Sequence, residues 1–216
     1  MPVPTALLFD FDGTLLDTES TVLDAWRQEY RHHGLELDEQ AWIGEIGGEV
    51  DRYPKLAALA GDGFDLERCQ KRKRALEARL VSALDLREGI LDCLKNAARV
   101  GIRLGVVSSS PSRWVLPHLE RLVLGEYFEV IVTREDAERA KPHPDLYLVA
   151  LSRLGVHAAG TVAVEDSANG VTAAVAAGIR CIAYPNSVTR RQDLTHANAV
   201  VDGSDLWTTL DDRPTT

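Results

Sequence analysis

The 216-residue sequence has few cysteines, no long apolar run and no excess of positive charge. Its cysteines, Cys69, Cys93 and Cys181, are odd in number and far apart, without a C-x-x-C or Cys/His grouping. This pattern argues against a disulfide framework and a structural zinc site, and suits a reducing compartment. No apolar stretch approaches the roughly 20 residues of a membrane span. The N-terminus also lacks a basic segment followed by an apolar signal core, so we expect a cytoplasmic protein that does not bind membranes.

The charge balance is acidic, with 24 Lys and Arg against 33 Asp and Glu and a net charge of −9. This balance argues against nucleic acid as a partner, because binding to phosphate backbones needs clustered cations. A small phosphorylated substrate remains possible, since it needs only a few local cations. The length allows one domain with a sizeable core, or one domain that carries a smaller inserted one.

Short apolar runs predict the strands of a sheet. Residues 5–9 are wholly apolar and end at an acidic loop, as expected of a strand buried on both faces. After Leu84, apolar runs alternate with helical patterns. The predicted strands lie at 5–9, 103–107, 130–132, 161–164, 180–183 and 199–201, and the helices between them at 89–99, 112–124, 144–154 and 168–177. This alternation predicts an α/β fold, a Rossmann-like parallel sheet with helices on both faces.

The block between the first strand and Leu84 has a different character, because it predicts helices alone, at 21–33, 38–43, 52–60 and 65–84. Gly44, Gly47 and Gly48 interrupt these helices. We therefore expect a catalytic core of residues 1–16 and 86–216 with an all-helical unit, residues 17–85, inserted into it. The tail from about Asp211 is expected to be loose.

Polar side chains follow four of the predicted strands, and in an open parallel sheet ligands bind at that edge. Each feature alone has an ordinary structural explanation, such as an acidic turn, a helix cap or a solvated lysine. Together they form an oxygen-rich site suited to Mg²⁺, with one lysine to balance charge. Serine hydroxyls and the helix start near Ser112 could bind phosphate oxygens. The residues are Asp10 and Asp12 after the first strand, Ser108 after the second, Lys141 after the third, and Glu165 and Asp166 after the fourth.

In order and spacing these residues resemble the four motifs of the haloacid dehalogenase (HAD) superfamily, and the resemblance covers nearly the whole chain. The chain is most similar to the capped sugar-phosphate phosphatases and β-phosphoglucomutases of that superfamily. The motifs stand here as Asp10-Phe11-Asp12-Gly13-Thr14, Val107-Ser108-Ser109, Lys141-Pro142-His143-Pro144-Asp145 and Val164-Glu165-Asp166-Ser167-Ala168-Asn169-Gly170. The resemblance implies a Rossmann-like core, a Mg²⁺ cofactor and a covalent aspartyl-phosphate.

The resemblance also implies a role for each motif residue. Asp10 would be the nucleophile and Asp12 the general acid and base, while Ser108 and Lys141 would hold the phosphoryl group. The implied metal ligands are Asp10, the backbone carbonyl of Asp12, Glu165 and Asp166. We expect further substrate contacts from Gly13, Thr14, Ser109 and Ser112. The helical insert would be a mobile cap hinged near 15–17 and 85–89, with Arg52 and Lys73 as candidate contacts.

Proteins with similar motifs have other activities, and the sequence distinguishes among them. The mutases place a histidine five residues after the aspartate of Asp17-Thr18, where this chain has Val22, so hydrolysis is favoured over a phosphomutase. A 2-haloacid dehalogenase does not keep the second aspartate, which is present here as Asp12. A non-catalytic binding protein would have lost motif residues, and none is lost. The expected substrate is a small phosphorylated metabolite, such as a sugar or polyol phosphate, and the expected state is a monomer.

Overall fold

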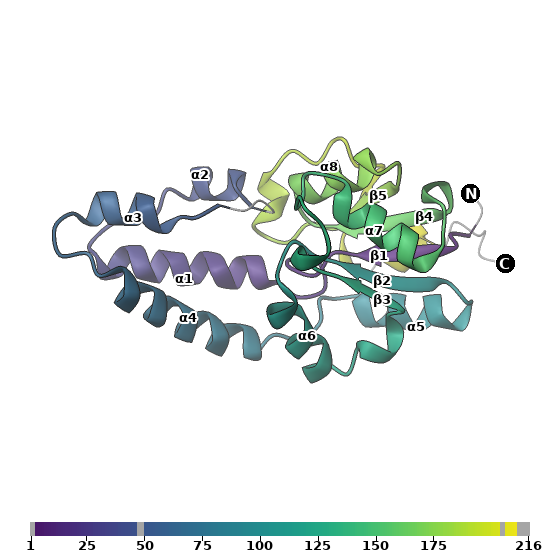
Figure 1. The fold of residues 1–216 in the computed structure, drawn as a ribbon, viewed down its shortest axis with the longest axis horizontal. Coiled ribbons are helices and arrows are strands. Elements are labelled where there is room, and N and C mark those ends of the chain that lie inside the picture. Colours follow the sequence, from purple (N-terminus) through teal and green to yellow (C-terminus); the bar gives the residue numbers. More distant parts are fainter. Residues whose placement is uncertain (1–2, 47–49, 204–205, 211–216) are drawn as a thin grey trace.

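The computed structural model describes residues 3–46, 50–203 and 206–210. Within them a parallel sheet of six strands has the order β3-β2-β1-β4-β5-β6 (Figure 1). The strands are β1 (Ala6–Phe9), β2 (Arg103–Val107), β3 (Val130–Val132), β4 (Thr161–Glu165), β5 (Arg180–Ala183) and β6 (Ala199–Val200). The predicted Rossmann-like α/β fold is therefore confirmed. Gly47, Gly48 and the tail from Asp211 lie outside the described residues.

Helices cover both faces of the sheet because successive side chains of a strand point to opposite faces. In β1, Leu7 and Phe9 belong to one buried cluster, and Ala6 and Leu8 belong to another. The first cluster packs against α5 (Ile90–Arg99), α6 (Ser112–Arg121) and α9 (Leu206–Leu210), and the second against α7 (Asp145–Leu154) and α8 (Ala168–Ala176). The central strand thus has no solvated face, which explains its wholly apolar sequence.

The segment between β1 and α5 forms a group of helices that extends to one side of the sheet (Figure 1). They are α1 (Thr18–His32), α2 (Glu39–Gly44), α3 (Tyr53–Ala60) and α4 (Leu66–Ser82), and the described residues between α1 and α4 contain no strand. These helices have a buried cluster of their own, which includes Trp26, Tyr30 and Leu56. No helix in the described part of the chain is long and apolar enough to cross a bilayer.

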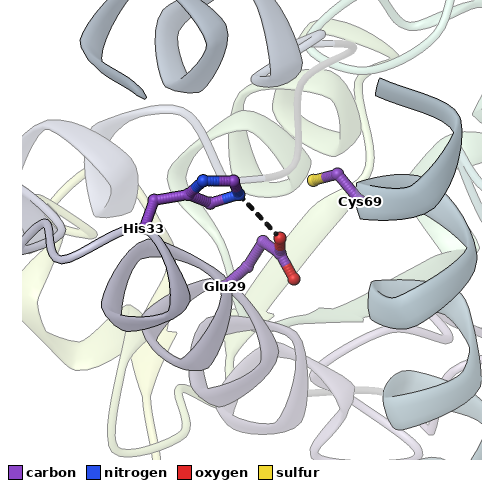
Figure 2. Close-up of side chains that lie close together, drawn as sticks. All are labelled: Glu29, His33 and Cys69. Carbon is purple, nitrogen blue, oxygen red and sulfur yellow. Dashed lines mark hydrogen bonds and ion pairs between the residues drawn. The ribbon is translucent and has the colours of Figure 1, made fainter. Parts of the chain in front are cut away.

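A buried carboxylate, Glu29, lies where α1 packs against α4 (Figure 2). Glu29 on α1 accepts hydrogen bonds from Arg72 on α4 through both of its oxygens, and His33 Nε2 lies 3.2 Å from Glu29 Oε1. Cys69 lies beside them. A carboxylate, an imidazole and a thiol together can hold a metal ion. Here, however, Arg72 already neutralises the charge of Glu29, and burial raises the pKa of the Cys69 thiol to about 12, which disfavours the thiolate that would bind a metal. We therefore interpret the cluster as a polar network that joins the two helices.

Helix α6 ends three residues earlier than the sequence predicts. Val123 adopts φ 55°, in the left-handed region, and the N–H of Leu124 donates to the carbonyl of Leu119. This pattern closes a helix, and glycine is the usual residue at the left-handed position. Because a valine stands there, the sequence carries no stop signal. The short α9 was likewise not predicted.

Candidate active site

A cavity of about 500 Å³ lies between the carboxyl edge of the sheet and the helical insertion. Residues of the sheet edge form one side of it, and residues of α1, α2, α4 and the start of α3 form the other. The described residues that line it are Asp10, Asp12, Thr18, Glu19, Val22, Trp42, Ile46, Arg52, Glu77, Ser108, Ser109, Ser110, Pro111, Arg113, Trp114, Lys141, Asp166 and Ser167. Five of the six motif side chains predicted to meet at this edge, all except Glu165, therefore lie in the cavity wall.

The loop after β1 passes very close to the end of β4. Gly13 has φ 82°, and a Cβ at this position would lie 2.0 Å from Asp166 Oδ2. Only glycine fits, both because of the left-handed backbone and because of the contact. The Gly13 N–H donates to the Leu16 carbonyl (2.7 Å) and to Thr18 Oγ1 (3.1 Å). Gly13 therefore shapes the loop in this structure, whereas the sequence predicts a contact with substrate.

Asp10 and Lys141 form a buried ion pair directly after β1. Lys141 Nζ lies 2.5 Å from Asp10 Oδ1, 2.6 Å from Glu165 Oε1 and 2.8 Å from the Val107 carbonyl oxygen. Burial raises the pKa of Asp10 to about 8, although the charge of Lys141 opposes this rise. Burial opposes the charge of Lys141, but Asp10 and Glu165 raise the pKa of this lysine. The lysine is thus a fixed positive charge beneath the carboxylate.

Glu165 lies deeper than the other acids and is fully buried. Its Oε1 accepts a hydrogen bond from the Tyr147 hydroxyl (2.6 Å) and from Lys141. A Cβ on Gly170, in the first turn of α8, would lie 1.9 Å from Glu165 Oε2. The glycine at the end of the fourth motif therefore makes room for this carboxylate.

The residues around Asp10 fit a divalent cation. One ligand oxygen from each of Asp10, Glu165 and Asp166 can be chosen so that all lie within 4.8 Å of one another. Asp10 Oδ2 and Glu165 Oε2 are buried and have no hydrogen-bond partner among the described residues. Burial and the charge of Asp10 hold the pKa of Asp166 well above its usual range. Three crowded carboxylates with one lysine lack positive charge, and a hard cation with oxygen ligands supplies it.

Asp12 occupies a different environment from Asp10, because neutral donors surround its carboxylate. Its Oδ2 accepts from the Ser110 hydroxyl at 2.6 Å, and its Oδ1 accepts from Trp114 Nε1 at 2.8 Å and from the Thr18 hydroxyl at 2.9 Å. Ser108 Oγ lies 3.5 Å from Oδ2. The two acids of the first motif are therefore chemically distinct.

The other predicted phosphate contacts divide into two groups. Ser109 lines the cavity, and its hydroxyl accepts a hydrogen bond from the Lys141 N–H (3.3 Å). Ser112 and Thr14 are not among the described lining residues. The Ser112 N–H donates to Glu135 Oε2 at 3.0 Å, so a carboxylate occupies the place predicted for a phosphate oxygen. Thr14 is fully buried.

The two predicted contacts of the insertion also differ in position. Arg52 lines the cavity, pairs with Glu45 (3.1 Å) and lies over the ring of Trp42. Lys73 is buried within the insertion, above the ring of Trp26 and 2.5 Å from Glu77 Oε1. Glu77, the acidic partner of Lys73, therefore lines the cavity in its place, and Lys73 is not among the described lining residues.

Several residues at the site were not predicted from the sequence as site residues. Trp114 could have been found, because a helix that starts just after β2 places its first turn at the same sheet edge. Asn186 had no such signal. Its Nδ2 lies 2.9 Å from Asp166 Oδ2, and its Oδ1 accepts from the N–H groups of Val188 and Thr189, which fixes the amide in place. Glu19 and Trp42 also line the cavity.

Comparison with known proteins gives consistent matches over most of the chain. A family model described as "Haloacid dehalogenase-like hydrolase" matches residues 7–184. YhcW of Bacillus subtilis (strain 168) is 38% identical over 186 residues, which cover 85% of this chain and 84% of that protein. The "Phosphorylated carbohydrates phosphatase" of Thermotoga maritima is 34% identical over 199 residues, which cover 90% of this chain and 92% of that protein.

A solved structure agrees over the same extent. The crystal structure of CbbY from Rhodobacter sphaeroides in complex with phosphate superimposes with a TM-score of 0.74 at 29% identity. The match covers 96% of this chain and 99% of that chain, so both the sheet and the helical insertion have counterparts there.

Proposed function

The chain belongs to the haloacid dehalogenase-like hydrolase family, and on this premise we propose that it is a magnesium-dependent phosphomonoester hydrolase. Its substrate would be a small phosphorylated metabolite, a sugar or polyol phosphate, and the reaction would pass through an aspartyl-phosphate on Asp10. The names of the relatives support this substrate class, since one is a phosphatase of phosphorylated carbohydrates.

The observation that carries the proposal is the difference between the two acids of the first motif. Asp10 lies against a buried lysine and two further carboxylates, whereas Asp12 lies among neutral hydrogen-bond donors. The first environment suits a metal-assisted nucleophile, and the second suits a group that exchanges protons. If Asp10 and Asp12 only formed an acidic turn, nothing would require their side chains to have different surroundings.

In the first step, a carboxylate oxygen of Asp10 attacks the phosphorus, and the bond from phosphorus to the ester oxygen breaks. Asp12 gives its proton to that departing oxygen, which leaves as an alcohol. Lys141 stays protonated and offsets the charge of the phosphoryl oxygens. Asp10, Glu165, Asp166 and the Asp12 carbonyl would hold Mg²⁺, whose charge would reduce the repulsion between phosphate and carboxylates.

In the second step, water attacks the phosphorus of the aspartyl-phosphate. Asp12, now ionised, takes a proton from this water, and the bond from phosphorus to the Asp10 oxygen breaks. Inorganic phosphate leaves, and both acids return to their starting states. Ser110, Trp114 and Thr18 hold the Asp12 carboxylate in place between the two steps.

We further propose that residues 17–85 act as a cap on the core of residues 1–16 and 86–216. The cavity has walls from both parts, so movement of the insertion would open it to substrate and close it against water. The chain is expected to act as a monomer, because a cap must open freely.

The central test is the substitution Asp10→Asn, which keeps the shape of the side chain but removes the nucleophile. Phosphate release should fall by about a thousandfold or more. The substitution removes one negative charge from three crowded carboxylates and so reduces their mutual repulsion. The fold should therefore stay intact, as measured by circular dichroism and the midpoint of thermal unfolding. Near-normal phosphatase activity in a folded variant would refute the assignment of Asp10. Treatment with EDTA should also abolish activity, and excess Mg²⁺ should restore it.

The alternative activity is a phosphomutase, and Val22 argues against it. This side chain lines the cavity at the position where the mutases have a histidine. With β-glucose 1-phosphate and catalytic glucose 1,6-bisphosphate, we expect free phosphate to appear. Formation of glucose 6-phosphate without free phosphate would overturn the choice of hydrolysis.

A further inference from the structure

Tyr147 is a buried tyrosine that the proposed chemistry does not use. It lies in the first turn of α7, shortly after Lys141 in the sequence, and it is fully buried. Its ring belongs to the same buried cluster as Leu8, Val107 and Ala163. Phenylalanine would fill this apolar place equally well, so the hydroxyl group needs a separate explanation.

The hydroxyl of Tyr147 holds one oxygen of Glu165. It donates to Glu165 Oε1 at 2.6 Å, and Lys141 Nζ lies 2.6 Å from the same oxygen. Glu165 is the last residue of β4, and it is one of the three acids whose oxygens lie close enough together to hold a metal ion. The orientation of this carboxylate therefore depends on donors from α7 and from the segment that precedes α7.

The other oxygen of Glu165, Oε2, has no such donor. It is buried and lacks a hydrogen-bond partner among the described residues. Gly170 leaves the room that this oxygen occupies, since a Cβ there would lie 1.9 Å from it. A buried carboxylate oxygen without a partner lowers stability, and a hard cation can compensate for this loss. Tyr147 and Lys141 thus fix Oε1, and Oε2 remains for the cation.

The ring of Tyr147 also lies against Lys141. Lys141 Nζ is 5.3 Å from the ring centroid, within the range of a cation–π contact. The same ammonium group lies 2.5 Å from Asp10 Oδ1. One side chain therefore contacts a proposed metal ligand through its hydroxyl, and the lysine beside the proposed nucleophile through its ring.

We propose that Tyr147 is a positioning residue that acts through Glu165 to set the affinity of the site for Mg²⁺. By holding Oε1, it keeps the carboxylate in the orientation that leaves Oε2 for the cation. Groups that hydrogen-bond to metal ligands fix the orientation of those ligands, and their loss lowers metal affinity by about ten- to a hundredfold. The inference rests on the proposed function and adds a residue that lies outside the four motifs.

Tyr147→Phe tests the role, because it removes the hydroxyl and keeps the ring. In isothermal titration calorimetry with MgCl₂ and no substrate, the variant should bind Mg²⁺ about tenfold more weakly than the wild type. In assays of phosphate release from a sugar phosphate, the Mg²⁺ concentration that gives half of the maximal rate should rise by a similar factor. At saturating Mg²⁺, the KM for the ester should change by less than about twofold, because no substrate contact is lost.

A matched control is Tyr184→Phe, which also removes a hydrogen bond of a buried tyrosine. The Tyr184 hydroxyl donates to the Glu88 carbonyl at 2.8 Å, and neither residue belongs to the acid cluster around Asp10. This variant should lose stability, measured by urea unfolding, and keep the wild-type affinity for Mg²⁺. If the hydroxyl of Tyr147 only stabilised the fold, the two variants would behave alike.

A double-mutant cycle determines whether the effect passes through Glu165. Glu165→Gln should weaken Mg²⁺ binding by itself. Tyr147→Phe should then change the affinity by less than about twofold further, because the charged ligand that the hydroxyl positions is gone. An equal loss of affinity from Tyr147→Phe with and without Glu165→Gln would refute the inference.

The outcomes separate this inference from the proposed function. If the wild-type protein binds no Mg²⁺ and releases no phosphate from sugar phosphates, the proposed function and this inference fail together. If the wild type does both, and Tyr147→Phe binds Mg²⁺ as tightly as the wild type, hydrolysis stands and the role of Tyr147 is refuted.

Discussion

At the scale of single residues, the carboxylate of Asp12 depends on its donors. Trp114 is the one donor that comes from a helix of the core, and its Nε1–H reaches Asp12 Oδ1 at 2.8 Å. Its ring also packs against His118, with the ring centroids 4.9 Å apart. The indole is thereby held from two sides, so it can fix the direction in which Asp12 points. We infer that Trp114 is a positioning residue for the proton transfers.

Substitution Trp114→Phe should keep the aromatic packing and remove one hydrogen bond to a carboxylate. Such a bond contributes about 1.5 kcal/mol, so kcat should fall by about tenfold. The KM should change little, because Ser110 and Thr18 still hold Asp12 and the phosphate contacts remain. Steady-state phosphate release measures both constants. Trp207→Phe, on α9 away from the cavity, is the control, and an equal loss of kcat there would contradict the role.

At the scale of the elements, the pairing of α1 with α4 depends on one buried carboxylate. Burial alone would raise the pKa of Glu29, but the hydrogen bonds from Arg72 and Cys69 outweigh burial and lower this pKa below the usual 4.5. A lowered pKa in the folded state means that the contribution to stability is present above pH 4.5. It is lost as the pH falls through the folded pKa, because protonation removes the charge that Arg72 binds.

We therefore expect the free energy of unfolding to decrease as the pH is lowered below about 4.5. Glu29→Gln should lower stability by about 2 kcal/mol at pH 7 and make this acid-induced decrease shallower. Urea unfolding at a series of pH values measures both effects. Glu67→Gln on the exposed side of α4 should follow the wild-type curve. A Glu29 variant whose pH dependence runs parallel to that of the wild type would contradict the role of this carboxylate.

At the scale of the whole molecule, Arg87 joins three parts of the chain where the insertion returns to the core. Its guanidinium donates to the carbonyl oxygens of Gly13 (2.5 Å), Tyr184 (2.7 Å) and Pro185 (2.8 Å). Its backbone N–H donates to the carbonyl of Leu15 at 2.9 Å. The contacts connect the expected hinge with the loop after β1 and with the loop after β5.

A lysine keeps the charge at this position but cannot reproduce the planar fork of donors. Arg87→Lys should therefore lower the free energy of unfolding by about 2 kcal/mol, since buried carbonyls lose charged partners. It should also lower kcat, because Gly13 lies next to Asp12, the proposed general acid and base. Arg99→Lys, at an exposed position on α5, should change stability by less than about 0.5 kcal/mol. Unchanged stability and kcat in the Arg87 variant would show that the three contacts are dispensable.

The sequence by itself determined the sheet and the chemistry of its edge. Apolar runs placed the strands, and the carboxyl ends of parallel strands meet at one edge whatever the loops between them do. Asp10, Asp12, Lys141 and Asp166 could therefore be brought together by spacing alone, and the structure has all four at one cavity. The sequence also predicts Glu165 at this edge, because it directly precedes Asp166.

Only the tertiary structure decided what the insertion contributes. Lys73 and Glu77 lie one turn apart on α4, and sequence favours the cation as the substrate contact. The packing of α4 against α1 instead buries Lys73 against Trp26 and leaves Glu77 at the cavity. The presence of Glu19 and Trp42 in the wall of the same cavity likewise depends on the angle between the insertion and the core. That angle results from side-chain packing between distant segments, which no local pattern encodes.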